Sequence, residues 1–525
     1  MQSVQGTQAM SDPTAVRPAD KRAFLKWAVL GAVGIVNGYA TILMYSRGEV
    51  AFALLTLILT TLALYIFGSR KTYAHRYIYP GIAGMILFIL FPLAYTVGLA
   101  FTNYSAKNQL TLERAQSVLM DQTFQSGESY AFQLYKTEQG YRLLIEDGDE
   151  RLATAPFSLS GNVPTDLNLE VIGGGIDGEV EPIKTIVGYR TQLSGIDLHF
   201  PDGEDIRMSG LRKFAAVKPL YTLQDDGETL TNNQSGQVLR PNMEIGFYQP
   251  INESGEFVGE RVSPGFVVSI GTHNFERVWK DDGIKEPFIN IFIWTVIFSV
   301  LTVIFTLMIG LVLASVVQWE ALKGRAIYRV LLILPYAVPA FISILIFRGL
   351  FNQSFGEINM VLNGLFGLSP AWFSDPLMAK TMVLIVNTWL GFPYMMILCM
   401  GLLKAIPDDL YEASAIDGAS FIHNFTKITL PMMIKPLTPL LIASFAFNFN
   451  NFVMIQLLTQ GGPNRIGTSE PAGYTDLLVS YTYRIAFEGG GGQDFGLASA
   501  IATLIFLLVG ALALLNLRFT KLSQQ

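Results

Sequence analysis

Eight long apolar segments constrain this chain more than any other feature. Each of them exceeds the length of about 20 apolar residues that a helix needs to cross a bilayer core of about 30 Å, or comes close to it. Only 15% of the residues are charged, against about 25% in a soluble domain. The sequence therefore predicts an all-α polytopic membrane protein with about eight transmembrane helices, at residues 23–45, 50–68, 77–101, 288–317, 327–350, 380–404, 431–458 and 495–517.

Acidic residues concentrate between the third and fourth of these spans. Residues 101–287 hold 28 Asp and Glu but only 16 Lys and Arg, a net charge of −12, whereas the rest of the chain has a net charge of +6. The short loops carry Lys and Arg, among them Lys71, Arg325 and Lys427, all on one side of the membrane if eight spans are correct. Basic loops stay in the cytoplasm, so we expect both termini to be cytoplasmic and the acidic block to lie outside.

These spans divide the chain into regions with different roles. The large block between the third and fourth spans has alternating strand-like pieces, such as Tyr130–Tyr135 and Ile196–Phe200, separated by turn residues. It therefore reads as a mainly β extracytoplasmic domain. The expected regions are a cytoplasmic leader at 1–22, three N-terminal transmembrane helices at 23–101, the extracytoplasmic domain at 102–287, a five-helix core at 288–517 with a cytoplasmic loop at 405–430, and a cytoplasmic tail at 518–525.

The sequence lacks the usual signs of an enzyme. It has no nucleophile elbow, no phosphate-binding loop and no zinc motif, and the two histidines of the external block, His199 and His273, have no ligand-like neighbours. No basic patch on the soluble part indicates nucleic-acid binding. We therefore expect no catalytic residues, no metal and no cofactor in this chain.

The cytoplasmic loop between the sixth and seventh spans carries a compact motif. Pro407, Asp408 and Asp409 are typical of a helix start, with acidic residues at its positive end, and Gly418 suits the reversal after a helix end. These residues predict a short helix over Tyr411–Ile416. On the residues alone, an ordinary capped helix that joins two spans is the more common explanation.

A resemblance changes that interpretation. The run Glu412 to Ala419, followed by Ile428, Leu430 and Pro431, resembles the EAA loop of the permeases of binding-protein-dependent ABC importers, although Ser414 stands where that motif has Ala. In that family the loop forms a coupling helix that sits in a cleft of the ATPase subunit. The resemblance implies an ATPase-coupling role for Glu412, Ala413, Ser414, Asp417, Gly418 and Ala419.

Within that family the chain is similar to the larger membrane subunit of maltose/maltodextrin importers. The layout of three spans, a large external domain and a five-span core is the same, and stretches such as Phe101–Ser105 and Ser444–Gln456 look alike. The resemblance implies a transporter subunit of the bacterial inner membrane, working by alternating access. Its implied partners are a second permease subunit, two ATPase subunits that bind ATP and Mg, a periplasmic maltose-binding protein, and maltose or maltodextrin.

Polar residues at membrane depth indicate a substrate site. Such residues are costly in a span and usually face the bundle interior or a water-filled cavity. Amides and phenols suit sugar hydroxyls, and aromatic faces suit pyranose rings. Hydrogen bonding between helices is the alternative use of Asn in membranes. Helical spacing places four of these positions on one face of the seventh span and four on one face of the sixth, and Tyr336 lies between two prolines of the fifth. The resemblance implies that all of them line the sugar site: Tyr336, Asn387, Leu390, Gly391, Tyr394, Ser444, Phe447, Asn448 and Asn451.

Two other functions compete with this interpretation. A membrane-protein insertase can also combine an early span, an external domain and a five-span core, but it needs a positive charge in mid-membrane. The core spans show none clearly, because Arg348 lies near a span end. A permease of the same family for another sugar is the second alternative, and the external domain argues against it.

Overall fold

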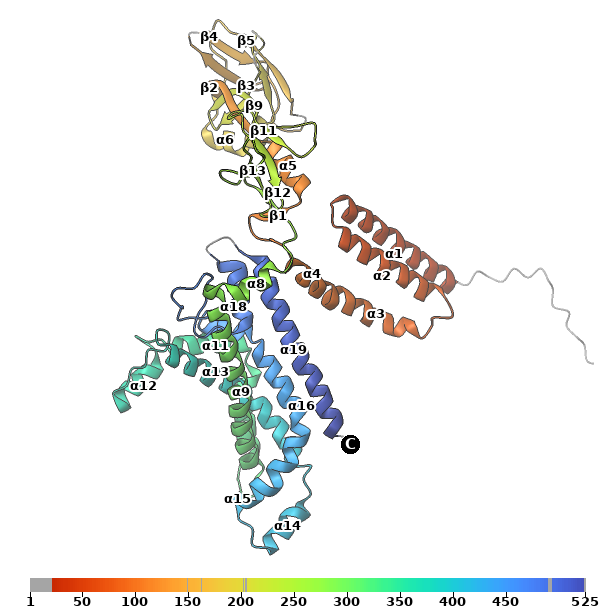
Figure 1. Ribbon diagram of the computed structural model, residues 1–525, viewed down its shortest axis with the longest axis vertical. Helices are drawn as coiled ribbons and strands as arrows, with labels where there is room; N and C mark the ends of the chain where they lie inside the picture. Colours follow the sequence, from red (N-terminus) through yellow and green to blue (C-terminus); the bar gives the residue numbers. More distant parts are fainter. Residues whose placement is uncertain are drawn as a thin grey trace, which may run out of the picture. The chain divides into compact units, whose positions relative to one another are not determined.

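The computed structural model describes residues 21–523 except positions 149, 162, 202, 204 and 490–492. Most of the expected leader, the end of the expected tail and part of the turn at 201–205 therefore lie outside the described residues. The chain divides into two compact units, Met1–Gly98 and Leu99–Gln525. Figure 1 shows the elements of both units.

The first unit is built from apolar helices. Helices α1 (Lys21–Ser46) and α2 (Val50–Gly68) form a hairpin, in which Lys26 Nζ donates to Gly68 O at 3.3 Å. The third expected span comprises α3 (His75–Met85), the π-helix η1 (Ile86–Leu90) and α4 (Phe91–Leu99). It packs against α2 through Phe52 and Phe91, whose ring centroids are 4.4 Å apart.

The external domain is mainly β, as the sequence predicts, and it has two cores. The larger core lies in an eight-stranded sheet with the order β3-β4-β5-β7-β8-β9-β2-β6, in which β2 also pairs with β3. Its buried side chains include Leu134, Ile145 and Phe214. The strands are β2 (Thr123–Thr137), β3 (Gly140–Asp147), β4 (Glu150–Thr154), β5 (Asp166–Val171), β6 (Glu179–Val180), β7 (Asp197–His199), β8 (Asp205–Gly210) and β9 (Lys213–Pro219), with helices α6 (Ile183–Gly188) and α7 (Arg190–Leu193) between β6 and β7.

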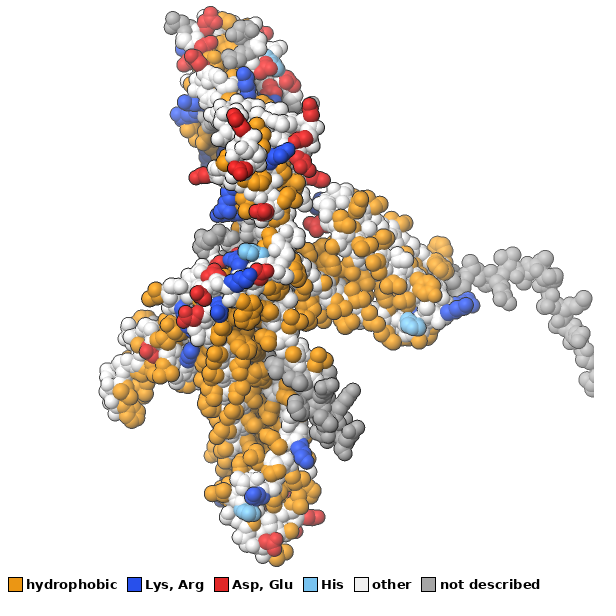
Figure 2. Space-filling model, viewed as in Figure 1, with side chains coloured by type: hydrophobic (Ala, Val, Ile, Leu, Met, Phe, Trp, Pro, Cys, Tyr) orange, Lys and Arg blue, Asp and Glu red, His pale blue; other side chains and the backbone are white. Residues whose placement is uncertain are grey.

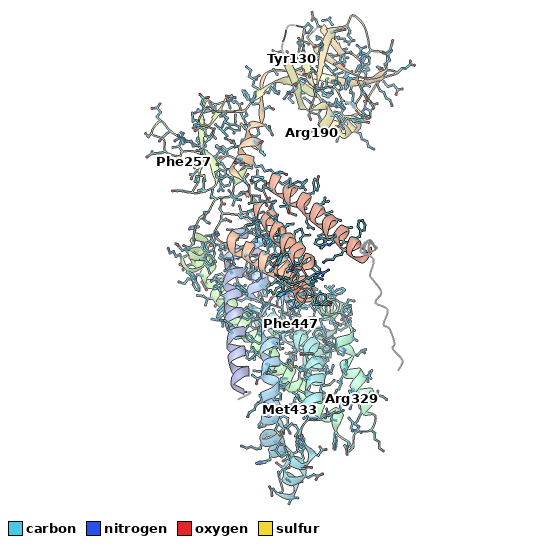
Figure 3. The ribbon with its side chains drawn as sticks, turned by 90° about the vertical axis from the view of Figure 1, so that its right-hand side faces the viewer. Tyr130, Arg190, Phe257, Arg329, Met433 and Phe447 are labelled. Carbon is cyan, nitrogen blue, oxygen red and sulfur yellow. The ribbon has the colours of Figure 1, made fainter. Side chains whose placement is uncertain are left out.

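The smaller core lies in a four-stranded antiparallel meander. It buries Leu230, Tyr248 and Phe266 beside helix α5 (Leu112–Met120). Figure 3 shows Phe257 in this lobe and Tyr130 and Arg190 in the other. The strands of the meander are β10 (Tyr221–Leu223), β11 (Leu230–Asn232), β12 (Val238–Asn242) and β13 (Phe247–Pro250).

The chain enters and leaves the external domain at one place. Strand β1 (Asn108–Leu110) on the way in pairs with β14 (Gly265–Phe266) on the way out. Nearer the helical core, Ile270 N donates to Phe101 O at 2.9 Å. Asn274 Nδ2 donates to the backbone oxygens of Ala100 and Thr102 at 3.0 and 2.9 Å. These bonds define a neck between the domain and the helical core.

The helical core contains the remaining expected spans. Among the described residues of the whole chain, six helices are long and apolar enough to cross a membrane, and the bent pair α10 and α11 would make a seventh. Helix α19 contains a shorter apolar stretch, Phe495–Ala511. Hydrophobic side chains cover the middle of the bundle in Figure 2, and charged side chains gather toward its ends. The helices are α8 (His273–Lys280), α9 (Asp282–Gln318), α10 (Arg325–Ala337), α11 (Ala340–Leu350), α12 (Glu357–Phe366), α13 (Pro376–Leu403), α14 (Asp408–Ile416), α15 (Phe421–Asn424), η2 (Phe425–Thr429), α16 (Leu430–Phe449), α17 (Phe452–Leu458), α18 (Leu478–Glu488) and α19 (Phe495–Ser523).

Two of the expected core spans are broken. The fifth bends by 91° between α10 and α11, where Val338 and Pro339 adopt extended backbone. The seventh ends as α16 at Phe449 and restarts as α17 at Phe452. Asn451 caps the new helix, because its side chain accepts a hydrogen bond from Met454 N. Breaks of this kind in membrane helices occur where the backbone is buried in protein or lines a water-filled cavity.

Candidate functional site

Three asparagines from two spans meet inside the helical core. Asn387 of α13 donates to Asn448 Oδ1 of α16 at 2.8 Å, and Asn451 donates back to Asn387 Oδ1 at 3.1 Å. Asn387 also donates to Thr302 Oγ1 of α9 at 3.2 Å. The side-chain amide of Asn448 in turn donates a hydrogen bond from Nδ2 to Ser444 O at 2.8 Å. The sequence-predicted residues Asn387, Ser444, Asn448 and Asn451 are thus brought together in one network, which we call the asparagine cluster.

The asparagine cluster satisfies its own polar groups. The Asn387 and Asn448 residues are buried, and each of their amide groups and carbonyl oxygens has a partner within the cluster or on its own helix. Hydrogen bonding between helices, the alternative considered for these asparagines, is therefore present in this structure. A ligand that used the same groups would have to replace these bonds one for one.

The aromatic candidates lie differently from the asparagines. Phe447 is 73% exposed, Tyr336 is 59% exposed and Tyr394 is 40% exposed. Figure 3 shows Phe447 on α16, well separated from Met433 of the same helix. Neighbouring residues of a helix point about 100° apart, which allows Phe447 to be exposed while the next residue, Asn448, is buried. Exposed aromatic faces of this kind suit an amphipathic ligand or partner surface.

Gly391 serves close packing between helices. A Cβ at this position would lie 2.8 Å from Thr306 Cγ2 of α9, which is too close for an unshifted side chain. Leu390 packs against the apolar cluster around Trp294, Val386 and Met454. These two candidates therefore support the backbone beside the asparagine cluster, whereas Tyr394 of the same helix is on its exposed side.

Thr302 is a member of the cluster that sequence reasoning missed. It belongs to a buried series on α9, Thr295, Ser299, Thr302 and Thr306. The spacing of four, three and four residues places these hydroxyls on one face of the helix. The sequence of the fourth span already shows this periodicity, which predicts a polar face on its helix. In the structure, Thr302 of this face contacts Asn387 of α13.

The motif in residues 405–430 forms a short helix with a sharp end. Helix α14 begins after Pro407 with Asp408 and Asp409 in its first turn, as the sequence predicts. Gly418 follows the helix with φ of +72°, a backbone conformation that residues with a Cβ rarely adopt. Ala419 N then bonds back to Ser414 O at 2.9 Å. The motif is therefore a helix followed by a tight reversal into α15.

Several side chains of this loop are exposed. Glu412, Ala413 and Asp417 are exposed on α14 and its cap. The large apolar side chains of Ile416, Phe421 and Ile422 are 89%, 78% and 73% exposed. The Ser414 hydroxyl bonds to Tyr411 O at 2.8 Å within the helix, so the substitution of Ala by Ser leaves no unsatisfied group. Exposed apolar side chains grouped on a polar loop are typical of a protein-interaction site.

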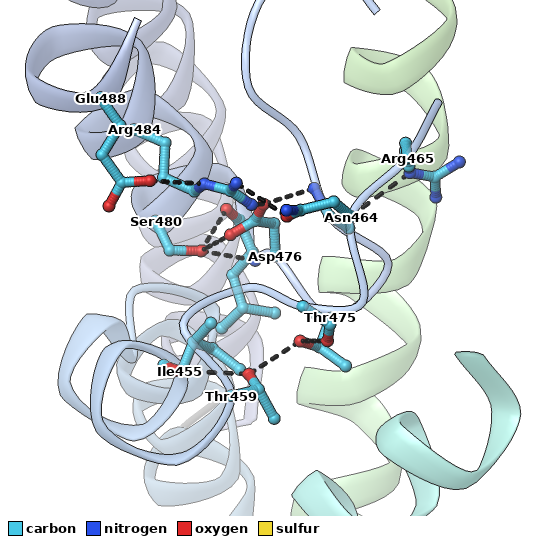
Figure 4. Close-up of polar contacts among 12 residues, drawn as sticks. Ile455, Thr459, Asn464, Arg465, Thr475, Asp476, Ser480, Arg484 and Glu488 are labelled. Carbon is cyan, nitrogen blue, oxygen red and sulfur yellow. Dashed lines mark hydrogen bonds and ion pairs between the residues drawn. The ribbon is translucent and has the colours of Figure 1, made fainter. Parts of the chain in front are cut away.

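A buried ion pair, which could not be predicted from the sequence, holds the loop between α17 and α18. Arg484 Nη1 lies 2.9 Å from Asp476 Oδ2, and the Asp476 side chain is fully buried. Arg484 also bonds Asn464 at 2.9 Å and Glu488 at 3.0 Å, as Figure 4 shows. Burial raises the pKa of the Asp476 carboxyl, while Arg484 and the Ser480 hydroxyl oppose this shift.

The same loop is fastened to the helical core. Thr459, at the end of α17, shares a 2.8 Å hydrogen bond with Thr475, and Leu478 N donates to Thr295 Oγ1 of α9 at 3.1 Å. Since Asn451 caps the start of α17, this helix connects the asparagine cluster to the loop between α17 and α18.

Comparison with known proteins identifies the family. The models that match are the maltose transport system permease protein MalF P2 domain over residues 110–271, the MalF N-terminal transmembrane region over 24–71, and the binding-protein-dependent transport system inner membrane component over 306–521. The chain is 98% identical, over 525 residues and the full length of both proteins, to the maltose/maltodextrin transport system permease protein MalF of Vibrio cholerae serotype O1. The chain belongs to the MalF family of permeases.

More distant relatives agree with this assignment. The permease is 81% identical over 524 residues to MalF of Vibrio vulnificus, with full coverage of both chains. It is 63% identical over 501 residues to MalF of Salmonella typhimurium, covering 95% of this chain and 97% of the relative. A permease of this family is a multi-pass membrane protein and not an enzyme, which confirms the resemblance seen in the sequence and removes the insertase alternative.

Proposed function

We propose that this permease is the larger membrane subunit of an ATP-driven importer that moves maltose and maltodextrins from a periplasmic binding protein into the cytoplasm by alternating access. The observation that carries the proposal is the 98% identity over the full length to a maltose/maltodextrin permease protein. The match of the external domain to a maltose-permease domain model over 110–271 favours maltose over another sugar.

The proposal includes the assembly in which the chain works. We place it in the bacterial inner membrane with both termini in the cytoplasm, because Lys and Arg gather in the loops on that side. Its partners are a second permease subunit, two ATPase subunits that bind ATP and Mg, and a periplasmic maltose-binding protein. Support for the binding protein comes from the match to a binding-protein-dependent transport component.

The sugar site lies at the asparagine cluster. The sugar rings lie against Phe447, Tyr336 and Tyr394, whose faces are exposed. Sugar hydroxyls replace the Asn387–Asn448 and Asn387–Asn451 bonds, so that a bound sugar exchanges one set of hydrogen bonds for another of similar strength. Ser444, Leu390 and Gly391 complete the site from the two helices that carry the asparagines.

Helix α14 couples ATP hydrolysis in the ATPase subunit to conformational change at the sugar site. Helix α14 and its reversal enter a cleft of the ATPase subunit, with Ile416 and Phe421 as apolar contacts, since both are largely exposed. Ala413 allows close approach and Gly418 holds the reversal. The coupling residues are Glu412, Ala413, Ser414, Asp417, Gly418 and Ala419.

Reconstitution tests the proposed function. The complete complex in proteoliposomes should take up radiolabelled maltose only when ATP and liganded binding protein are present, and it should not take up labelled glucose. Gly418→Pro should uncouple ATP hydrolysis from transport because Pro fixes φ near −65°. Gly418→Asn should retain more coupling, since Asn tolerates positive φ. Maltose uptake that does not depend on ATP would overturn the proposal.

A further inference from the structure

The seventh span begins with an unusual turn. Residues Phe425–Thr429 form the π-helix η2 between α15 and α16. Within it, Thr429 Oγ1 lies 3.4 Å from Asn424 O, five residues earlier, and the Thr429 residue is buried. The π-helical turns are rare and occur frequently at functional sites, which directs attention to what holds this one.

A tyrosine of the motif helix contacts the end of that turn. Tyr411 of α14 shares a 2.8 Å hydrogen bond with Thr429 Oγ1. Thr429 has one hydroxyl proton, and Asn424 O is placed to accept it, so the Tyr411 hydroxyl is the donor in this arrangement. Among the side-chain hydrogen bonds of the described residues, this is the one that joins α14 to the seventh span.

Apolar packing surrounds the bond. The Tyr411 ring packs with Phe425 and Ile428 against a core that includes Ile406, Met433 and Leu437. The hydroxyl of Tyr411 therefore has a fixed position at the junction of α14, η2 and α16. In contrast, the connection through the backbone runs over the reversal at Gly418 and the short helix α15.

We infer that Tyr411 is a positioning residue whose hydroxyl holds helix α14 against the first residues of the seventh span. The inference rests on the proposed function, because it assigns a mechanical step to the coupling loop. Helix α16 runs from Leu430 to Phe449, a length of about 30 Å at 1.5 Å per residue, and it carries Asn448 of the asparagine cluster in its last turn. A displacement of α14 by the ATPase subunit reaches the asparagine cluster through this hydrogen bond and this helix.

The test measures how much ATP is hydrolysed for each maltose transported by the complete reconstituted complex. Tyr411→Phe keeps the ring and removes the hydroxyl, and Thr429→Val keeps the shape and removes the acceptor. Each variant should raise ATP consumed per maltose by about threefold to tenfold, with normal amounts of assembled complex. The double variant should match Thr429→Val, because that variant already removes the bond to Tyr411 together with the bond to Asn424 O. Thr429→Ser retains a hydroxyl and should restore normal coupling.

A matched control lies on the same turn. The Thr426 hydroxyl bonds only to Ile422 O and His423 O of its own helical segment, so Thr426→Val should leave the ratio of ATP to maltose unchanged. Wild-type ratios in Tyr411→Phe and Thr429→Val would overturn the inference, as would effects that add in the double variant. A lower amount of complex with an unchanged ratio would show a merely structural role and would overturn it too.

The outcome separates this inference from the proposed function. If Gly418→Pro uncouples the transporter and Tyr411→Phe does not, the coupling role proposed for the loop is kept and only the role inferred for the Tyr411 hydroxyl is wrong. If neither Gly418→Pro nor Tyr411→Phe changes the ratio, the coupling function assigned to the loop fails as well.

Discussion

Replacing Asn448 by Ala distinguishes sugar binding by the asparagine cluster from hydrogen bonding that only holds the helices together. In the structure, this side chain accepts a hydrogen bond from Asn387 at 2.8 Å and donates to Ser444 O of its own helix. The substitution removes both bonds and leaves Asn387 Nδ2 with Thr302 Oγ1, at 3.2 Å, as its remaining partner. The interhelical part of the loss is therefore one hydrogen bond between α13 and α16.

The two readings predict effects of different size on different quantities. If the bond only holds helices together, its loss costs about 0.6 to 1.7 kcal/mol, as for other interhelical hydrogen bonds in membranes, and lowers the yield of assembled complex by about threefold to twentyfold. If Asn448 binds sugar, a hydroxyl in a desolvated site loses its partner at a cost of about 1–3 kcal/mol. Transport efficiency then falls by about fivefold to 140-fold in complexes that assemble normally.

The assay compares purified complex yield with the initial rate of ATP-dependent maltose uptake per complex. Asn450→Ala is the matched control, because Asn450 is exposed and its amide bonds only Ala446 O of the same helix, at 3.2 Å. We expect Asn450→Ala to cost much less than Asn448→Ala. Normal yield together with wild-type uptake in Asn448→Ala would refute the sugar site proposed here.

Three further predictions follow from other parts of the molecule. In a Cys399→Ser background, a cysteine at Glu150 should react with an impermeant maleimide in cells whose inner membrane is intact; labelling only after permeabilisation of that membrane would reverse the topology. Deletion of residues 110–275 with a short Gly/Ser bridge should abolish stimulation of the ATPase by liganded maltose-binding protein, and unchanged stimulation would show that the external domain is not the docking site. Arg484→Met removes the cation beside Asp476, whose pKa burial already raises. An acid with a raised folded-state pKa loses stability as pH rises from the pKa of a free carboxyl, so thermal unfolding should show a larger loss at pH 8 than at about pH 4, and an equal loss at both would contradict the role of the pair.

The sequence predicted the elements whose signals are local. Helix α14 and the reversal at Gly418 follow from capping residues and from a glycine at the helix end, and strand β7 at Asp197–His199 follows from the alternation in Ile196–Phe200.

Long-range partners were harder to predict. The pair of Asp476 and Arg484 depends on the folding of a loop over itself, and the 2.8 Å bond between Tyr411 and Thr429 joins residues 18 apart. The spacing of Phe447 and Asn448 placed both on one stripe, whereas in the structure Asn448 is buried and Phe447 is exposed, because they lie on opposite borders of it.

The neck of the external domain bears on how such a protein arises. Phe101 and Ile270 are joined by a hydrogen bond of 2.9 Å, so the two ends of the inserted segment are neighbours. Domain insertion is tolerated where chain ends lie close together, because the host fold needs no rearrangement to receive the insert. The external domain is therefore built as a module that a simpler permease can receive at this point of its chain without a change in its own fold.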